Sequence, residues 1–247
     1  MKATNDSVSY RKRLATLPRL GEPLGNRDLN AHGVASNYAA RLAREGWLVH
    51  LGRGAYMLPG DQLTLEGSLA FLSDRIPGLH IGGKSALSRR GVRHHVAFQD
   101  RVSLWSDEQA RLPAWFLSRF ECTYQVTRLF DAKLPHGFGL QPLPNGHPKV
   151  LVSVPERALL ELLSDVGKTE ALADVRPLVE SLHSLREKVL DTLLKHTTRI
   201  KVLRLAHSLA EELSLPWAEL ARAHSKRKGG ARWIAQTKTG ERLVLKK

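Results

Sequence analysis

The hydrophobic pattern of the first sixty residues predicts three short helices. Residues 9–17, SYRKRLATL, form the first, and the second begins at Asn26, whose side chain is suited to cap it. A turn at Gly33-Val34 leads into the third helix, residues 35–45, because glycine permits a tight turn and the valine can point into a core. The glycine that follows is typical of a helix end.

The third predicted helix has two different faces. Ala35, Ala39 and Leu42 share the apolar face. The other face is polar and cationic, and its residues are Ser36, Asn37, Ala40, Arg41 and Arg44. We therefore expect the apolar face to pack inward and the other face to offer positive charge to a partner.

Two apolar runs after this helix predict a β-hairpin. Residues 47–51 and 55–58 are separated by Gly52-Arg53-Gly54, a tight turn with an arginine at its tip. Helix, helix, turn, helix and hairpin is the element order of a winged helix-turn-helix. In that module the second helix of the pair enters the DNA major groove, and the wing lies over a phosphate backbone.

The chemistry of the exposed face predicts DNA reading, since asparagine can pair with adenine and arginine with guanine. The remaining basic residues suit phosphate contacts. The candidate DNA-binding residues are Ser36, Asn37, Tyr38, Arg41, Arg44 and Arg53, together with Arg11, Lys12 and Arg13 near the N-terminus. Two alternatives stay open: a helical domain whose basic surface is only solvated, and a winged helix that contacts protein.

The rest of the chain mixes short apolar runs with amphipathic stretches. The expected elements, in chain order, are a helix at 63–75, a strand at 79–81, a helix at 84–90, strands at 96–105 and 121–129 with a helix at 112–120 between them, a strand at 150–152 followed by a buried helix, three amphipathic helices in 170–224 and a terminal hairpin turning at Thr239-Gly240. The predicted fold class is α+β, with an N-terminal winged helix-turn-helix followed by a mixed α+β C-terminal domain.

The stretch KVLVSVPERALLELLSDVG is expected to lead from a strand into a buried helix. Ser153 and Glu156 have the S-x-x-E spacing of a capping box, and Pro155 suits the first turn. The apolar stripe of the helix consists of Leu159, Leu162, Leu163 and Val166 and ends at Gly167.

The stretch GLHIGGKS, residues 78–85, satisfies the spacing G-x-x-x-x-G-K-[ST] of a phosphate-binding loop. In such a loop an apolar strand precedes the first glycine, whereas here a helix end precedes it and the apolar residues lie inside the motif. We therefore interpret Gly82-Gly83 as a break from a strand into a helix that packs Ala86 and Leu87. No nucleotide or other cofactor is expected.

The distribution of positive charge along the chain predicts a polyanionic partner. Of the 247 residues, 42% are hydrophobic and 25% charged, which is typical of a soluble globular protein, and the net charge is +14. Residues 1–60 carry 9 Lys and Arg against 4 Asp and Glu, and residues 225–247 carry 8 against 1. Two basic ends favour a polyanion held from two places over charge kept for solubility. Candidates for an additional nucleic-acid contact are Lys226, Arg227, Lys228 and Arg232.

The sequence contains no apolar run long enough for a signal peptide or a membrane span, so we expect a cytoplasmic protein without a membrane partner. Cys122 is the single cysteine, which excludes an internal disulfide and is interpreted as a small hydrophobe. His94 and His95 are adjacent in a predicted loop, where neighbouring side chains diverge, and no metal site is expected from them.

One enzymatic alternative remains open. Asp131 and Lys133, with Asp100 or Asp107 upstream, faintly match the carboxylates and x-Lys of metal-dependent nucleases. The Asp-x-Lys of those enzymes lies on a strand, whereas here a proline and a glycine follow at once. We expect no catalytic residues and no enzymatic activity, with a winged-helix protein carrying a nuclease-like second domain as the alternative.

Three stretches together carry a family resemblance: the predicted winged helix-turn-helix at 9–58, HIGGKSALSRRGV at 80–92 and LVSVPERALLELL at 151–163. The chain resembles the AbiEi family of type IV antitoxins, which double as transcriptional regulators. The resemblance implies that the N-terminal domain binds inverted repeats in the protein's own promoter. It also implies that the C-terminal domain counteracts an AbiEii-type nucleotidyltransferase toxin from the same operon, without a stable complex.

The sequence thus predicts three regions with separate roles. Residues 1–60 are the DNA-binding domain, residues 62–224 neutralise the toxin, and residues 225–247 form a basic hairpin or tail. The predicted function is an antitoxin that represses its own operon.

Overall fold

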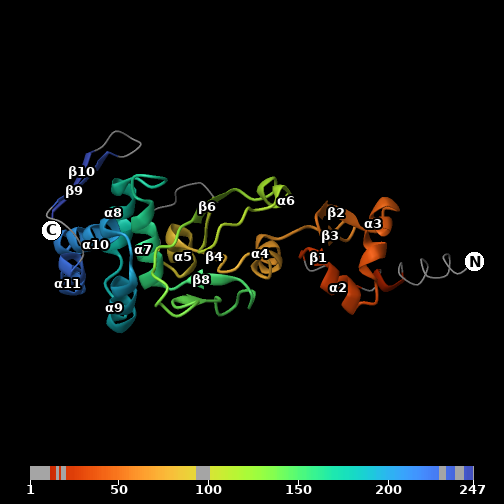
Figure 1. Ribbon diagram of the computed structural model, residues 1–247, viewed down its shortest axis with the longest axis horizontal. Helices are drawn as coiled ribbons and strands as arrows, with labels where there is room; N and C mark the ends of the chain where they lie inside the picture. The colour runs from red at the N-terminus through yellow and green to blue at the C-terminus, as the bar shows by residue number, and fades with distance from the viewer. Residues whose placement is uncertain are drawn as a thin grey trace, which may run out of the picture. The chain divides into compact units, whose positions relative to one another are not determined.

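Figure 1 shows the computed structural model of the protein, which describes residues 12–14, 17, 21–92, 101–227, 232–236 and 242–246. For Arg227 and the last two segments only the backbone is described. The chain divides into two compact units. The first contains 1–76, 111–121 and 145–150, and the second contains 77–110, 122–144 and 151–247. Helices and mixed sheets occur in the described residues, so the α+β class is confirmed.

The first unit begins with two helices and a small antiparallel sheet. Its elements are β1 (Leu24–Gly25), α2 (Asn26–Ala31), α3 (Ser36–Arg44), β2 (Val49–Gly52) and β3 (Ala55–Met57). The sheet order is β1-β3-β2, and α3 lies beside the β2–β3 hairpin in Figure 1. The predicted order of helix, turn, helix and hairpin is therefore observed. Strand β1, which the sequence pattern did not indicate, pairs Leu24 with Tyr56.

A continuous hydrophobic core holds these elements together. Its buried residues are Leu14, Leu17, Leu29, Val34, Ala39, Leu42, Leu48, Tyr56 and Leu58. Val34 is fully buried in the turn between α2 and α3, as the sequence predicts. Ala35, in contrast, is exposed because it is the N-cap residue outside the helix.

The predicted cap of α2 is wrong by one residue. Asn26 is the first helical residue, and Gly25 occupies the cap position. The Asp28 carboxylate accepts a hydrogen bond of 2.7 Å from the Gly25 backbone N–H, which satisfies a donor at the helix start. Of the predicted first helix, 9–17, only the helical turn at 12–14 and the isolated position 17 are described.

Two further helices complete the first unit: α4 (Leu65–Ser73) and α6 (Ala114–Leu117). Thr64 caps α4, since its hydroxyl accepts the Gly67 N–H at 3.0 Å. The Trp115 ring of α6 packs edge-on against Phe71 of α4, with ring centroids 6.1 Å apart. Segments distant in the sequence therefore share one core.

The second unit contains a five-stranded mixed sheet of order β6-β5-β4-β8-β7. Its strands are β4 (His80–Ile81), β5 (Val102–Ser106), β6 (Cys122–Val126), β7 (Leu140–Gln141) and β8 (Leu151–Ser153). Strand β4 pairs parallel with β8 and antiparallel with β5. The strand predicted at 96–105 begins only at Val102, and residues 93–100, including His94, His95 and Asp100, lie outside the described residues.

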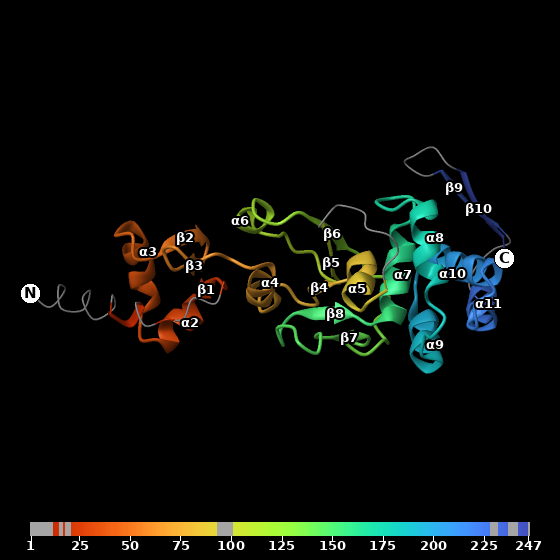
Figure 2. The same ribbon diagram turned by 180° about the vertical axis from the view of Figure 1, so that it is seen from behind.

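Helices cover this sheet and extend the unit. They are α5 (Gly83–Arg89), α7 (Pro155–Asp165), α8 (Leu172–Glu180), α9 (Glu187–His196), α10 (Ile200–Glu212) and α11 (Ala218–Arg227). Figure 2 shows α7 between the sheet with α5 and the helices that follow. Residues 170–224 hold four helices, so the prediction of three was wrong. Extended residues at 197–199 separate α9 from α10.

The chain ends in an antiparallel hairpin, as expected. Strands β9 (Arg232–Gln236) and β10 (Arg242–Lys246) pair in register from Arg232 with Lys246. The predicted turn at Thr239-Gly240 lies outside the described residues. Among the described helices, not one combines the length and apolar character required to cross a membrane.

Candidate nucleic-acid interface

Helix α3 is oriented by its two buried residues. Ala39 and Leu42 are almost completely buried, and Tyr38 is half-buried against the same core. This anchoring leaves Asn37 exposed in the first turn and directs Arg41 toward solvent with 38% of its side chain accessible. The face predicted to read DNA is therefore at the surface.

Arg41 lies within a row of side chains on α3. Its Nε donates to Glu45 Oε1 at 2.8 Å, and its guanidinium carbon is 6.0 Å from the centre of the Tyr38 ring. The hydrogen bond and the charge of Glu45 raise the pKa of Arg41, so the guanidinium stays protonated. Glu45 is not among the residues predicted from the sequence, although its i,i+4 spacing from Arg41 is a signal for this pair.

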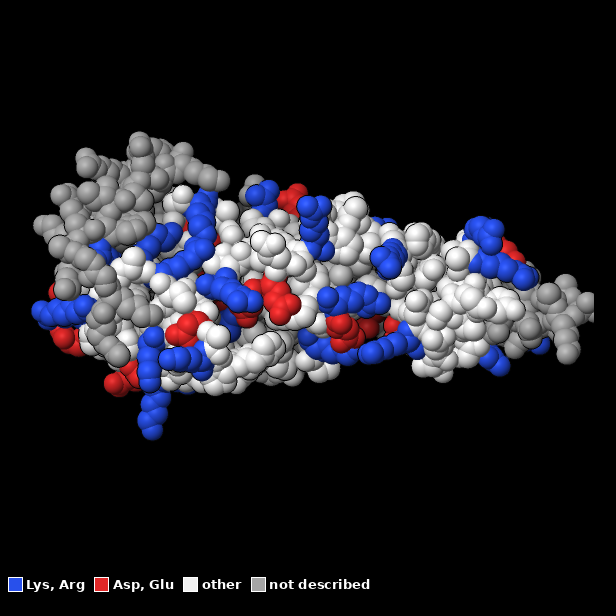
Figure 3. Space-filling view, in the orientation of Figure 1, with Lys and Arg blue, Asp and Glu red and all other residues white. Residues whose placement is uncertain are grey.

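The other two predicted cations of the module are also exposed. Arg44 is the last residue of α3, and Arg53 lies in the turn of the β2–β3 hairpin. Figure 3 shows basic groups over the part of the chain that holds α3, with an acidic group beside them. The exposed charge of α3 is thus mainly positive, and Glu45 is its acidic component.

Three predicted residues lie around the turn between the helices. Ser36 donates to Asn30 Oδ1 at 3.2 Å, which links the start of α3 to α2. Arg13 donates to the Gly33 carbonyl oxygen at 2.6 Å, so its side chain braces the turn. Lys12 is exposed on the preceding helical turn, and Arg11 lies outside the described residues.

The basic residues of the C-terminal region are only partly described. Lys226 is exposed on α11. Arg227 ends that helix and Arg232 begins β9, while Lys228 lies outside the described residues. Their contribution to nucleic-acid binding therefore stays a prediction.

Arg75 supports the hairpin and was missed by sequence reasoning. Its guanidinium lies over the Phe71 ring, 3.5 Å from the centroid, and Nη1 donates to the Phe71 carbonyl at 3.0 Å. Nη2 donates to the Gly54 carbonyl at 3.4 Å, next to Arg53. Burial lowers the pKa of Arg75, against the opposing charges of nearby aspartates. A partner 21 residues away leaves no local pattern in the sequence.

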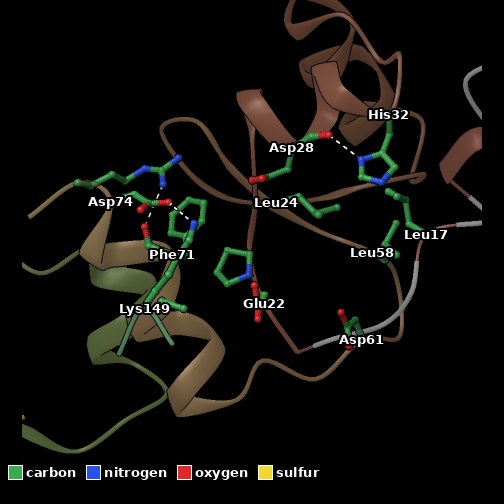
Figure 4. A pocket seen from close by; sticks show the side chains of 13 residues that line it. Leu17, Glu22, Leu24, Asp28, His32, Leu58, Asp61, Phe71, Asp74 and Lys149 are labelled. Carbon is green, nitrogen blue, oxygen red and sulfur yellow. Dashed lines mark hydrogen bonds and ion pairs between the residues drawn. The ribbon is translucent and has the colours of Figure 1, made fainter. Parts of the chain in front are cut away.

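A cavity of about 300 Å³ in the first unit has the wrong charge for phosphate. Carboxylates of Glu22, Asp28, Asp61 and Asp74 line it, beside Arg75 and Lys149 (Figure 4). Lys149 pairs with Asp74 at 2.8 Å, and the backbone oxygen of Asp28 bonds the His32 ring at 2.8 Å. Because the carboxylates outnumber the cations here, a phosphate would be repelled.

The GGKS stretch is a strand-to-helix junction, as predicted: β4 ends at Ile81 and α5 begins at Gly83. The Gly83 N–H donates to Glu161 Oε2 at 3.0 Å, so a carboxylate of the protein occupies the anion position at this helix start. A Cβ at Gly82 would collide with the same carboxylate oxygen, and Gly83 has a φ of +51°. Lys84 Nζ is 3.7 Å from a carboxylate oxygen of Glu170.

Glu161 is the centre of a buried network. Oε1 accepts from His80 Nε2 at 2.9 Å and from Arg157 Nε at 2.8 Å, and Oε2 also accepts from the Ser153 hydroxyl at 2.8 Å. Burial alone would raise the pKa of Glu161, but the charges and hydrogen bonds of His80 and Arg157 lower it to about 2. The other His80 ring nitrogen faces the Gly78 carbonyl at 2.6 Å, so both ring nitrogens face acceptors.

The capping box predicted for α7 is wrong. Val154 is the N-cap residue, and the Ser153 hydroxyl bonds Glu161 instead. Glu156 is buried and accepts three hydrogen bonds from Arg186, at 2.8, 3.0 and 2.9 Å. Burial opposes ionisation, but these bonds outweigh it and lower the pKa of Glu156. Pro155 does occupy the first turn, as predicted.

The nuclease alternative gains no support from the geometry. Asp131 Oδ1 bonds His196 Nδ1 at 2.8 Å and accepts the Lys133 N–H at 2.9 Å, which makes Asp-x-Lys part of a turn. Asp107 lies 3.8 Å from Arg157. Over the described ranges, no three or more His, Cys, Asp or Glu residues are grouped to hold a metal ion. Burial raises the pKa of the Cys122 thiol, which favours its role as a hydrophobe.

Comparison with solved structures shows a similar fold. A crystal structure of the RV2827C protein from Mycobacterium tuberculosis matches with a TM-score of 0.57 and 17% identity, over 91% of this chain and 81% of that one. At that identity the likeness shows a common fold. No functionally curated protein matches the chain.

Family comparison covers nearly the whole sequence. Residues 8–98 match the family described as the N-terminal domain of the AbiEi antitoxin, a transcriptional regulator. Residues 99–245 match the family described as a transcriptional regulator, AbiEi antitoxin, of a type IV toxin–antitoxin system. The chain therefore belongs to the AbiEi family of type IV antitoxins and transcriptional regulators.

Proposed function

We propose that this protein represses its own operon by placing α3 in the major groove of inverted repeats in the promoter. The observation that carries the proposal is the division of α3, which buries Ala39 and Leu42 and exposes Asn37, Arg41 and Arg44. An asparagine and an arginine one turn apart can pair with base edges, and the hairpin beside α3 carries Arg53 toward a backbone phosphate.

Base and phosphate contacts respond differently to substitution, which provides the test. Arg41→Ala should weaken binding to the promoter fragment by roughly 1–3 kcal/mol and binding to a scrambled fragment much less. Asn37→Ala should follow the same pattern. Arg53→Ala should weaken binding to both fragments alike and reduce the salt slope by about one unit. The measurement is a salt titration of binding to each fragment.

Arg176→Ala is the matched control, since it removes one positive charge from an exposed site on α8, where Arg176 pairs with Glu212. It should leave the preference for the promoter unchanged. If Arg41→Ala lowers the affinity for both fragments equally, α3 contacts the DNA backbone and does not read bases. If Arg41→Ala, Asn37→Ala and Arg53→Ala all leave binding unchanged, the N-terminal module is not the DNA-binding surface.

We further propose that the region after residue 62 antagonises a nucleotidyltransferase toxin of the same operon, without a stable complex and without a catalytic step. The family's description as a type IV antitoxin supports this role. A full-length chain carrying Arg41→Ala and Arg53→Ala, expressed from an independent promoter, should still rescue growth under toxin expression. Loss of rescue in this folded variant would show that neutralisation needs DNA binding.

A further inference from the structure

We propose that Glu45 sets the DNA selectivity of the module: it holds the Arg41 guanidinium in a reading position and repels phosphates that would bind it without regard to sequence. This inference rests on the proposed DNA binding by α3. Glu45 would be a positioning residue, because it acts through Arg41 and touches no base itself.

The geometry fixes the orientation of the arginine. Tyr38, Arg41 and Glu45 are spaced by three and four residues and therefore follow one side of α3. Glu45 engages Arg41 Nε at 2.8 Å, and the Tyr38 ring is close to the guanidinium. With Nε held, the two terminal nitrogens remain as the planar pair of donors that matches O6 and N7 of guanine. A side chain that is already oriented loses less conformational freedom on binding.

Helix stability does not explain the carboxylate. Glu45 is the C-cap residue of α3, where the partial charge of the helix end is negative and a carboxylate is unfavourable. Arginine preceding glutamate by four residues is also the less favourable order for an ion pair along a helix. The helix itself therefore gains little from Glu45, and the benefit that we propose lies in DNA binding.

Electrostatics supplies that benefit. Both members of the pair are accessible, with 38% of the Arg41 side chain and 29% of the Glu45 side chain exposed, so DNA can approach both. A phosphate near Arg41 meets the negative charge of Glu45, whereas the neutral acceptors of a guanine edge do not carry a full charge to be repelled. Glu45 thus penalises backbone binding more than base reading.

The test compares Glu45→Gln with the wild-type chain on the promoter fragment and on a scrambled fragment. Glutamine keeps an oxygen that can accept from Arg41 but removes the charge. Affinity for the scrambled fragment should rise about two- to fivefold, and the ratio of promoter to scrambled affinity should fall. Glu45→Ala, which also releases the guanidinium, should lower the ratio further. Neither substitution should lower the thermal melting temperature.

Two controls separate this effect from a simple change of net charge. Glu180→Gln, at an exposed position of α8, should leave the ratio unchanged. In an Arg41→Ala background, Glu45→Gln should raise both affinities equally and no longer change the ratio.

An unchanged ratio for Glu45→Gln in the wild-type background would overturn the inference while leaving DNA reading by α3 intact. The inference would also be overturned if Glu45→Gln lowered the ratio of promoter to scrambled affinity by the same factor in the Arg41→Ala background. A wild-type chain that shows no preference for the promoter would instead overturn the proposed function itself.

Discussion

Helices α3 and α7 have similar lengths, 9 and 11 residues, but use their charged side chains in opposite ways. Helix α3 buries only Ala39 and Leu42 and keeps its cations at the surface. Helix α7 is buried along almost all of its length, including charged residues such as Arg157 and Glu161. A buried charge must be neutralised inside the protein, whereas an exposed one can be neutralised by a partner.

The partners of Glu161 show what burial demands. All four of its neighbours donate: His80, Arg157, Ser153 and the Gly83 N–H. This arrangement ties β4, α5, β8 and α7 together at one carboxylate. Arg41 of α3 has Glu45 beside it but lies in water, where such a pair contributes little to stability. The charges of α7 therefore serve folding, and those of α3 remain available for the proposed DNA binding.

The substitution with the largest expected effect on stability is Glu161→Gln. A carboxylate only accepts hydrogen bonds, whereas the amide nitrogen of glutamine would face donors, and the neutral side chain would leave the buried Arg157 guanidinium without its compensating charge. We expect unfolding to become easier by about 3–5 kcal/mol. Chemical denaturation would measure the change, and Glu180→Gln, an exposed control on α8, should stay within about 0.5 kcal/mol. Equal stability of the two variants would contradict the assignment.

Acid should weaken the same network. The pKa of Glu161 is lowered from 4.5 to about 2, so the folded state binds fewer protons than the unfolded chain between these values. The contribution is present above pH 4.5 and is lost as the pH falls toward 2, up to about 3 kcal/mol. Glu156, whose pKa is also lowered, adds in the same direction. Denaturation midpoints should fall across this range, and less steeply in Glu161→Gln; a constant midpoint would contradict the prediction.

Asp165, at the end of the same helix, should have the opposite effect on the pH dependence of stability. It is 4% exposed, and its Oδ1 has no hydrogen-bond partner within the described part of the chain. Burial raises its pKa from 3.8 to about 7, against the nearby positive charge of Lys168. Ionisation therefore costs stability as the pH rises through this range.

Asp165→Asn removes that cost. The variant should be more stable by about 1–3 kcal/mol at pH values above 7 and unchanged at pH values below 3.8. Thermal melting at both ends of the range would check this. A destabilised variant at high pH would mean that the Asp165 carboxylate compensates Lys168 or Lys201 more than its burial costs.

Local signals in the sequence were enough for the module around α3. Helix periodicity, the glycine turns and the hairpin predict its elements, because each depends on residues close together in the chain. Strand β1 was missed because its pairing of Leu24 with Tyr56 joins residues far apart. Arg41 and Glu45 could have been paired from their spacing, since the contact lies within one helix.

The junction of α7 shows why the rest was not predictable. The spacing of Ser153 and Glu156 is compatible with a capping box, but it is equally compatible with two separate contacts to other residues. Their real partners, Glu161 and Arg186, are chosen by packing in three dimensions. The glycines of GGKS could be recognised as a junction, but the carboxylate that fills it lies 78 residues further along the chain.

Arg44→Ala is expected to have the smallest effect on stability, in contrast to Glu161→Gln. Arg44 is exposed at the end of α3, so its removal should change the free energy of unfolding by less than about 0.5 kcal/mol. If it contacts a phosphate, binding to promoter and scrambled DNA should weaken alike, and the salt slope should become shallower by about one unit. Thermal melting and a salt titration measure the two quantities on the same sample. A destabilisation above about 1 kcal/mol would mean that α3 also uses its cations for folding. A loss confined to the promoter would instead make Arg44 a base-reading residue.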